Sequence, residues 1–267
     1  MKKTVSSISF ALLAAILLGG CQPKAPERNP VKEYSQQYVS AFLWHESSAE
    51  SHYIYLQGFA QARKMVEEKL NSDKEWICPS VVLDLDETVL NNNPYTAMLI
   101  DKGLIYTEET WAEWVNRAEA KALPGATEFL NFCAENGVTL WYISNRSNDY
   151  LDATIQNMMN LGLPNADAEH VLLKKETSDK TPRRVLVMDN CHVLLYLGDN
   201  LRDYDEMFKD REENLGKTEV DRNLDHMLTD FLLFPNPTYG EWEKAWSGDS
   251  TDAELNNRSE HIKSFAY

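Results

Sequence analysis

The sequence has few basic side chains for its size. Only 26 Lys and Arg residues stand against 42 Asp and Glu residues among 267 in total, which gives a formal net charge of −16. Non-specific binding of a nucleic-acid polymer needs a basic face, so we expect no such partner. An anionic substrate would have to be held by a local cluster of cations or by a metal ion, against the field of the whole protein.

Histidine and cysteine are also scarce. The six histidines include no His-x-x-x-His pair, so the sequence does not predict a zinc site. Apart from Cys21, the cysteines are Cys78, Cys133 and Cys191, and their spacing suits neither a metal knuckle nor a dense disulfide framework. An export compartment would permit one disulfide. We expect each of the three to behave as a small buried apolar residue.

A long transmembrane run is missing as well. Two lysines precede the apolar residues 8–18, which lead into Leu18-Gly19-Gly20-Cys21. This stretch has the length of a signal peptide and is too short for a comfortable membrane span. Small residues before a cysteine resemble the bacterial lipobox. That resemblance implies cleavage after residues 1–20, lipidation of Cys21 and, with Gln22 in place of Asp, sorting to the outer membrane. An ordinary secretory signal is the alternative.

The remainder of the chain divides into a tether, a domain and a tail. Residues 21–31 are polar and Pro-rich, which is typical of a tether. Residues 32–246 form the predicted domain, with a small cap at about residues 91–122 that includes N-terminal helices within residues 32–70, and residues 247–267 form a polar, peripheral tail. The pattern over residues 32–70 predicts two helices whose apolar face consists of Trp44, Tyr53, Leu56, Phe59 and Met65.

Four apolar runs alternate with helix-length segments over the centre of the chain. The runs end at residues 83, 143, 173 and 197, a further run covers residues 231–234, and the predicted helices lie at 125–136, 149–161 and 177–189. This alternation indicates βα units, a parallel sheet and right-handed crossovers. The predicted fold class is therefore α/β: a Rossmann-like core with a parallel sheet flanked by helices, plus a small, mostly helical cap.

Reactive side chains follow these runs. Asp84 and Asp86 come after the first run, Ser144 after the second, Lys180 in the helix after the third, and Asp199 and Asp203 after the fourth. The carboxyl ends of parallel strands lie at one edge of a sheet, so these residues can converge. The alternative is that the aspartates only cap helices or form turns.

This set of residues suits phosphoryl transfer. A carboxylate can attack phosphorus to form an aspartyl-phosphate, while a second carboxyl group protonates the leaving alkoxide and later deprotonates water. Oxygen ligands from Asp84 and Asp199, with help from Asp203, suit Mg²⁺. The metal and Lys180, together with Arg146, would supply the local positive charge that an acidic protein needs.

The motifs resemble those of the haloacid dehalogenase (HAD) superfamily. The matching residues are Asp84-Leu85-Asp86-Glu87-Thr88, Ser144, Lys180 and Gly198-Asp199-Asn200-Leu201-Arg202-Asp203. More narrowly, the chain resembles class C acid phosphatases, or 5′-nucleotidases, of the bacterial outer-membrane lipoprotein e family. Their bipartite signature is matched by residues 82–90 with Tyr95 and by residues 194–204, where Tyr204 replaces the usual Phe. The resemblance covers roughly residues 35–246.

The resemblance implies a role for each matched residue. Asp84 is the nucleophile and a metal ligand, Asp86 is the acid/base and lends its backbone carbonyl to the metal, and Asp199 is the direct metal ligand with Asp203 in support. Ser144 and Lys180 bind phosphate; the Ser178–Arg183 context favours Lys180 over Lys174 and Lys175. Thr88 either orients Asp86 or only begins the next turn. Tyr95, Trp111 and Tyr239 are the candidates for stacking on a nucleobase.

The resulting hypothesis is a Mg²⁺-dependent acid phosphatase, lipid-anchored in the bacterial cell envelope, that hydrolyses small phosphomonoesters, 5′-nucleotides among them. Two alternatives remain open. One is a phosphotransferase, which shares the aspartyl-phosphate, and the other is a non-catalytic nucleotide- or haem-binding surface lipoprotein. Asp84, Asp86, Asp199 and Asp203 are all present, which argues against the non-catalytic alternative. The sequence is compatible with a homodimer and does not determine the oligomeric state.

Overall fold

The computed structural model describes residues 28–211 and 213–266, and every structural statement below refers to these residues. The predicted signal peptide, Cys21 and most of the tether therefore lie outside the described residues. Within the described part of the chain, no helix combines the length and the apolar character that a membrane crossing would require.

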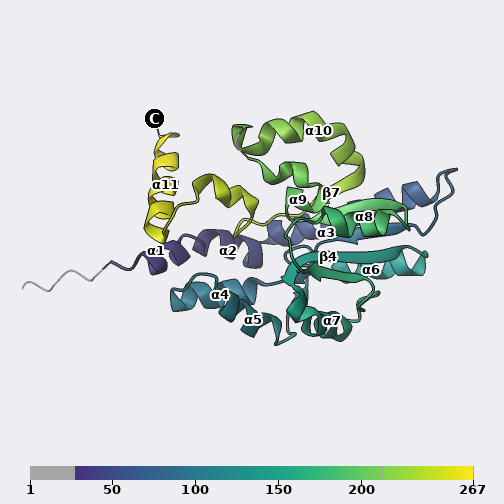
Figure 1. The fold of residues 1–267 in the computed structure, drawn as a ribbon, viewed down its shortest axis with the longest axis horizontal. Helices are drawn as coiled ribbons and strands as arrows, with labels where there is room; N and C mark the ends of the chain where they lie inside the picture. Colours follow the sequence, from purple (N-terminus) through teal and green to yellow (C-terminus); the bar gives the residue numbers. More distant parts are fainter. Residues whose placement is uncertain (1–27, 212, 267) are drawn as a thin grey trace, which may run out of the picture.

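A five-stranded parallel sheet forms the centre of the fold (Figure 1). Its spatial order is β5-β4-β1-β6-β7, and the strands are β1 (Ser80–Leu83), β4 (Thr139–Ser147), β5 (Val171–Lys174), β6 (Val193–Gly198) and β7 (Phe231–Leu233). Each neighbouring pair runs parallel. The predicted α/β class and the four predicted strands are confirmed, and the run at residues 231–234 supplies the fifth strand.

Helices cover both faces of this sheet. Side chains alternate along a strand, so Val81 and Leu83 of β1 face one way and pack into the large core, while Val82 packs on the other face against Val187. The first face is covered by α3 (Ala49–Leu70), α6 (Ala126–Glu135) and α7 (Leu151–Asn160), and the second by α8 (Thr181–Met188) and α10 (Lys217–Asp230). Burial of each such Val or Leu contributes about 1.5–3 kcal/mol.

The N-terminal segment forms three helices, not the predicted two: α1 (Pro30–Gln36), α2 (Val39–Ser47) and α3. The helical conformation is interrupted at Ser48, whose backbone is extended. Its side chain accepts a hydrogen bond from the Ser51 amide at 3.0 Å and so caps α3. The buried stripe of α3 consists of Tyr55, Phe59, Ala62 and Val66. The predicted face is thus wrong at Trp44, Tyr53 and Leu56, which are exposed by 36%, 63% and 41%.

A short antiparallel pair, β2 (Leu90–Asn91) and β3 (Lys121–Ala122), brackets an insertion after β1. The insertion contains α4 (Asn93–Lys102) and α5 (Glu108–Val115), and α5 begins with a capping box formed by Thr107 and Thr110. α4 also contacts α1 and α2. The division into a core and a cap that includes the N-terminal helices stays a prediction.

The C-terminal part contains more structure than its polar sequence indicated. After β6 come α9 (Leu201–Tyr204) and α10, and after β7 a 3-10 segment, η4 (Glu241–Trp246), leads into α11 (Thr251–Lys263). Ser250 caps α11 by accepting from the Ala253 amide at 3.2 Å, and Leu255 is buried. α11 packs against α1, at the left of Figure 1. The prediction of a merely polar, peripheral tail did not foresee this helix.

Cys78 and Cys191 form a disulfide although 113 residues separate them. Cys78 lies just before β1 and Cys191 just before β6, and these strands are neighbours in the sheet. The sequence left one disulfide open, and these two cysteines form it, which goes beyond the expectation that each cysteine is a small buried apolar residue. It holds for Cys133, which is free and buried.

Candidate active site

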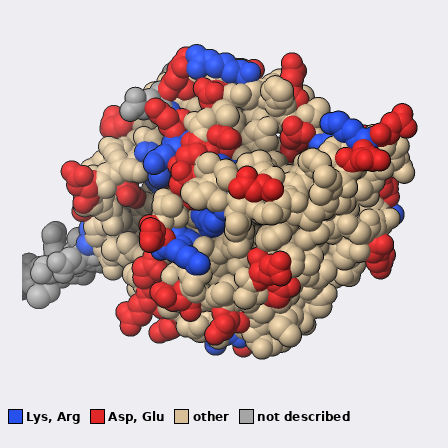
Figure 2. All heavy atoms as spheres, turned by 45° about the vertical axis from the view of Figure 1, so that its right-hand side comes forward, with Lys and Arg blue, Asp and Glu red and all other residues tan. Residues whose placement is uncertain are grey.

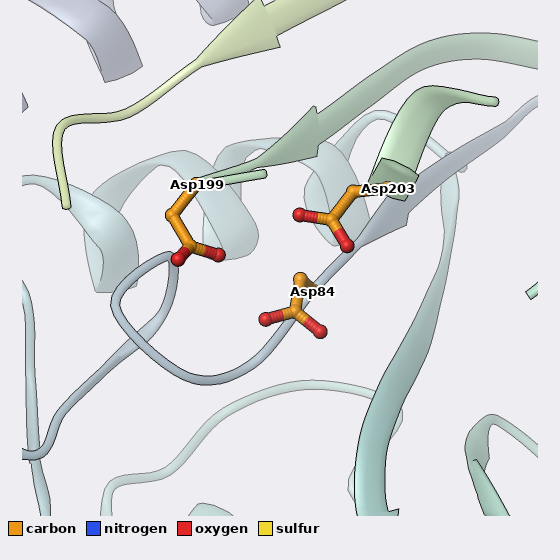
Figure 3. A group of neighbouring side chains, drawn as sticks. All are labelled: Asp84, Asp199 and Asp203. Atoms are coloured by element: carbon orange, nitrogen blue, oxygen red, sulfur yellow. The ribbon is translucent and has the colours of Figure 1, made fainter. Parts of the chain in front are cut away.

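Three carboxylates converge at the carboxyl ends of β1 and β6 (Figure 3). Asp84 follows β1, and Asp199 and Asp203 follow β6; one oxygen atom from each lies within 4.8 Å of the others. The strands meet here because the Asp84 amide donates to the Leu197 carbonyl at 3.0 Å and so continues the ladder. Gly198 is required, because a Cβ there would collide with the Asp203 carboxylate. The predicted convergence of these three residues is observed.

Lys180 lies inside this carboxylate cluster. Its Nζ is 2.5 Å from Asp84 Oδ1 and 2.6 Å from Asp203 Oδ1, and the residue is only 4% exposed. Lys180 is the N-cap residue of α8 and not part of the helix as predicted, since α8 begins at Thr181. Burial alone would lower the pKa of Lys180, but Asp203 and Asp84 raise it above its ordinary value. The ammonium group is thus held charged beside Asp84.

Ser144 lies near the carboxyl end of β4 and is almost fully buried. β4 extends to Ser147, four residues beyond the predicted end at Ile143, and its pairing with β5 is irregular after Ile143. The Ser144 hydroxyl accepts from the Arg146 amide at 3.2 Å, while Arg183 donates to the Ser144 carbonyl at 2.6 Å. Ser144 lines the same cavity as Asp84.

Asp86 is not one of the three clustered carboxylates, and two neighbours hold its side chain. Arg146, which is 3% exposed, donates to Asp86 Oδ1 from Nη2 at 2.7 Å and from Nε at 3.0 Å. Asn92 donates from Nδ2 to the same oxygen at 2.7 Å and accepts from Trp114 Nε1 at 2.8 Å. Arg146 was expected to add positive charge for the phosphate; here its guanidinium pairs with Asp86 instead.

The sequence did not predict that Asn92 and Trp114 help to hold Asp86. Asn92 belongs to the run Asn91-Asn92-Asn93-Pro94, whose composition is typical of a turn or loop. Its backbone amide also donates to Glu87 Oε1 at 2.9 Å, and Glu87 in turn accepts a short hydrogen bond from the Tyr239 hydroxyl. Glu87, within the Asp-x-Asp-x-Thr motif, is buried and has a positive φ. Neither property is visible in the sequence, so this network could not be predicted from it.

Thr88 contacts Asp199, which is part of neither of the two roles considered for Thr88 from the sequence. Its hydroxyl donates to Asp199 Oδ1 at 3.5 Å, and Asn236 donates to Asp199 Oδ2 at 2.8 Å. Both residues therefore support Asp199. Asn236 comes from the Pro235-Asn236-Pro237 segment after β7, which reaches the site because β7 is the neighbour of β6.

The clustered carboxylates disfavour one another's ionisation. Burial is the main cause that raises the pKa of Asp84, to about 7; Lys180 acts in the opposite direction, and Asp203 and Asp86 add to the rise. Burial, followed by the negative charges of Asp203 and Asp84, also raises the pKa of Asp199 well above its ordinary value. Three oxygen donors that repel one another are a suitable donor set for a hard divalent cation. Asp84, Asp199 and Asp203 could hold such an ion.

A cavity of about 540 Å³ contains all of the catalytic candidates. The predicted stacking residues Tyr95, Trp111 and Tyr239 also line it. Tyr95 and Trp111 pack edge to face with ring centroids 5.1 Å apart, and Tyr95 is only 6% exposed, whereas Tyr239 is 39% exposed. Outside this cavity, acidic side chains are spread over the face seen in Figure 2, in agreement with the net charge of −16.

Comparison with known proteins gives two kinds of match. Residues 24–242 match the family described as HAD superfamily, subfamily IIIB (acid phosphatase). The solved structure of the class C acid phosphatase from Bacillus anthracis is 36% identical with a TM-score of 0.82, over 87% of this chain and 99% of that one. A second structure, of the class C acid phosphatase from Bacillus anthracis with tungstate bound, is 36% identical with a TM-score of 0.81, over 86% and 98% of the two chains.

Proposed function

Because the chain belongs to the HAD superfamily, subfamily IIIB, the acid phosphatases of class C, we propose that it hydrolyses small phosphomonoesters, 5′-nucleotides in particular, with Mg²⁺ and through a phosphorylated Asp84. The observation that carries the proposal is the position of Asp84. Its carboxylate lies between Asp199, Asp203 and the Lys180 ammonium, within a cavity large enough for a small ligand.

In the first step, an oxygen of Asp84 attacks phosphorus and the bond from phosphorus to the ester oxygen breaks. Asp86 delivers its proton to that oxygen, so that an alcohol leaves and not an alkoxide. Arg146 and Asn92 hold the Asp86 carboxyl group in place, at 2.7 Å each. Lys180 and the Ser144 hydroxyl would bind the oxygens of the phosphoryl group, and the lysine offsets their negative charge.

In the second step, water attacks phosphorus while Asp86 accepts its proton, and the bond between phosphorus and Asp84 breaks. Inorganic phosphate leaves, Asp84 is again a carboxylate and Asp86 again carries a proton. Splitting hydrolysis into two displacements of this kind lowers each barrier.

The metal would be held by Asp84 and Asp199, with Asp203 in support and the Asp86 carbonyl as a further ligand. When bound, Mg²⁺ polarises the phosphoryl oxygens and offsets their charge. The fit rests on three mutually repelling carboxylates in a buried site, of which Lys180 neutralises only part.

The relative with tungstate bound supports the substrate class. Tungstate is a tetrahedral oxyanion like phosphate, and the Bacillus anthracis enzyme binds it. The aromatic side chains in the cavity, Trp111 and Tyr239 among them, support an ester whose leaving group carries a flat ring.

The test is a turnover screen of phosphomonoesters with and without Mg²⁺. Purified protein should release phosphate from 4-nitrophenyl phosphate and from 5′-AMP, lose this activity with a chelator and regain it with Mg²⁺. Failure to hydrolyse any ester under all metal conditions would remove the proposal. Indifference to the chelator would remove only the metal.

We also propose that Cys21 anchors the protein to the outer membrane through lipid. The support is the Leu18-Gly19-Gly20-Cys21 motif with Gln22 behind it. Labelling cells with a tagged fatty acid should mark the wild-type protein but not Cys21→Ser, and fractionation of the envelope would identify the membrane. An unlabelled wild-type protein would contradict the anchor.

A further inference from the structure

The C-terminal helix α11 forms part of the wall of the catalytic cavity. Thr251 and Glu254 of this helix line the same cavity as Asp84 and Lys180. α11 begins beyond residue 242, where the match to the phosphatase family ends. The family model therefore does not include the wall that α11 provides.

Arg258 attaches α11 to other residues of the cavity wall. Its Nη2 donates to Glu243 Oε1 at 2.6 Å and to the hydroxyls of Tyr34 and Tyr38 at 2.8 and 3.3 Å. Tyr34, Tyr38 and Glu243 all line the cavity. The Arg258–Glu243 pair is well shielded, with side-chain exposures of 14% and 18%. Together with the buried Leu255, this pair fixes α11 in place.

The charges that line the cavity have an uneven distribution. Away from the catalytic aspartates, the acidic residues on the wall are Glu241, which pairs with Arg202 and Lys244, Glu243, which pairs with Arg258, and Glu254. The cations that line the described cavity are Arg146, Lys180 and Arg202, and each is already paired with carboxylates: Arg146 with Asp86, Lys180 with Asp84 and Asp203, and Arg202 with Glu206 and Glu241. Among these residues, no cation remains unpaired to receive a second anionic group of a substrate.

From this arrangement we propose that α11, through Glu254, makes the wall selective for the charge of the leaving group. Esters whose leaving group is neutral or cationic are accepted, and those that carry a further anionic group at their distal end are rejected. The proposal rests on the proposed phosphatase function. Its physical basis is that the phosphoryl group is held at Asp84 and Lys180, so the rest of the ester extends along the cavity, where a carboxylate repels a negative charge.

The experiment compares two esters of nearly equal size that differ in distal charge: N6-benzyl-AMP and N6-(4-carboxybenzyl)-AMP. The wild-type kcat/KM should favour the neutral ester by about tenfold. The reason is that the repulsion between Glu254 and the distal carboxylate, in a partly buried cavity, corresponds to a ratio of about that size. In Glu254→Gln the preference should shrink, and in Glu254→Lys it should vanish or reverse. Turnover of 4-nitrophenyl phosphate, which lacks a distal group, should stay unchanged in both variants.

Glu260→Lys is the matched control, because it makes the same charge change on the same helix at an exposed side chain outside the cavity. Its preference should equal that of the wild type. Equal kcat/KM for both esters in the wild type, or equal shifts in Glu254→Lys and Glu260→Lys, would overturn the proposal, as would hydrolysis of 4-nitrophenyl phosphate with no turnover of either adenine ester. If no phosphomonoester is hydrolysed at all, it is the phosphatase function that fails.

Discussion

Strands β1 and β6 meet at both ends of the sheet, but the contacts at the two ends are opposite in kind. At the amino ends, the Cys78–Cys191 disulfide joins the strands covalently. At the carboxyl ends, the same strands deliver Asp84 and Asp199, two carboxylates whose pKa values are both raised, chiefly by burial and further by nearby negative charges such as that of Asp203. One end of the strand pair stabilises the fold, and the other end holds the groups proposed for chemistry.

This contrast indicates how the protein tolerates its own active site. Buried carboxylates at close range cost free energy unless they are paired or bind a metal ion. Lys180 compensates part of that cost, and the remaining repulsion is opposed by the parallel ladder and by a cross-link that lies away from the site. Changes at the carboxyl end should therefore affect activity more than stability, and changes at the amino end should do the reverse.

The largest expected effect is that of Asp84→Asn. An amide cannot act as the nucleophile, so turnover of 4-nitrophenyl phosphate should fall by about 10⁴-fold or more. The thermal unfolding midpoint should remain close to that of the wild type, because Asn has the same shape and removes a repelling charge. Substantial residual turnover in a correctly folded variant would contradict the covalent mechanism.

The next effect is that of Asp86→Asn, and it should depend on the leaving group. Loss of a general acid costs about 10²–10⁴-fold when the leaving group needs a proton. We expect a loss of that size for kcat with 5′-AMP and a smaller one for formation of 4-nitrophenolate, which is a stable anion. Rates of the first turnover measured by rapid quench would show this difference, and equal losses for both substrates would exclude Asp86 as the acid.

Replacement of both Cys78 and Cys191 by Ser tests the amino end. Loss of a cross-link that closes a loop of this length should lower the free energy of unfolding by about 2–5 kcal/mol. Turnover at 25 °C should remain within about twofold, since the sulfurs are remote from the carboxylates and a small loss of stability leaves most molecules folded. Urea unfolding measures the first quantity, with the reduced wild-type protein as the control. A large loss of activity would mean that the two ends are not separable.

The smallest effect is the stabilisation by Mg²⁺. An ion bound only by the folded protein at a concentration of 100 times its Kd adds about 2.7 kcal/mol. The thermal midpoint should therefore rise with Mg²⁺ in the wild type and in the double serine variant, but not in Asp199→Asn. Calorimetry measures this without reference to activity, and an equal rise in Asp199→Asn would contradict the assignment of the metal site.

The sequence sufficed for those parts of the site that depend on a strand and its next residues. Asp84 and Asp199 were placed because a short apolar run ends directly before each of them, and parallel strands bring such ends together. The position of the buried stripe on α3 was missed because Tyr53 and Tyr55 are equally apolar in sequence and only packing distinguishes them. The same holds for the helix α11, whose polar composition gave no sign of Leu255 as a buried contact.

Contacts between residues far apart in the chain were beyond the sequence altogether. The disulfide, the pairing of Arg146 with Asp86 and the contact of Asn236 with Asp199 span 113, 60 and 37 residues. Each depends on the order of strands in the sheet, which the alternation of runs and helices does not determine. The predicted cluster was found because Asp84 and Asp199 directly follow strands, whereas the supporting residues come from elsewhere.

Direct detection of phosphate on Asp84 tests the central claim. Asp86→Asn, mixed with 4-nitrophenyl phosphate, forms the aspartyl-phosphate while its hydrolysis is slowed, so acid quenching should preserve the intermediate. Borohydride then reduces the acyl phosphate to an alcohol, and peptide mass spectrometry identifies the modified residue. We expect homoserine at position 84 and none in the double variant that also carries Asp84→Asn. Conversion of another residue, or none at all while turnover proceeds, would contradict it.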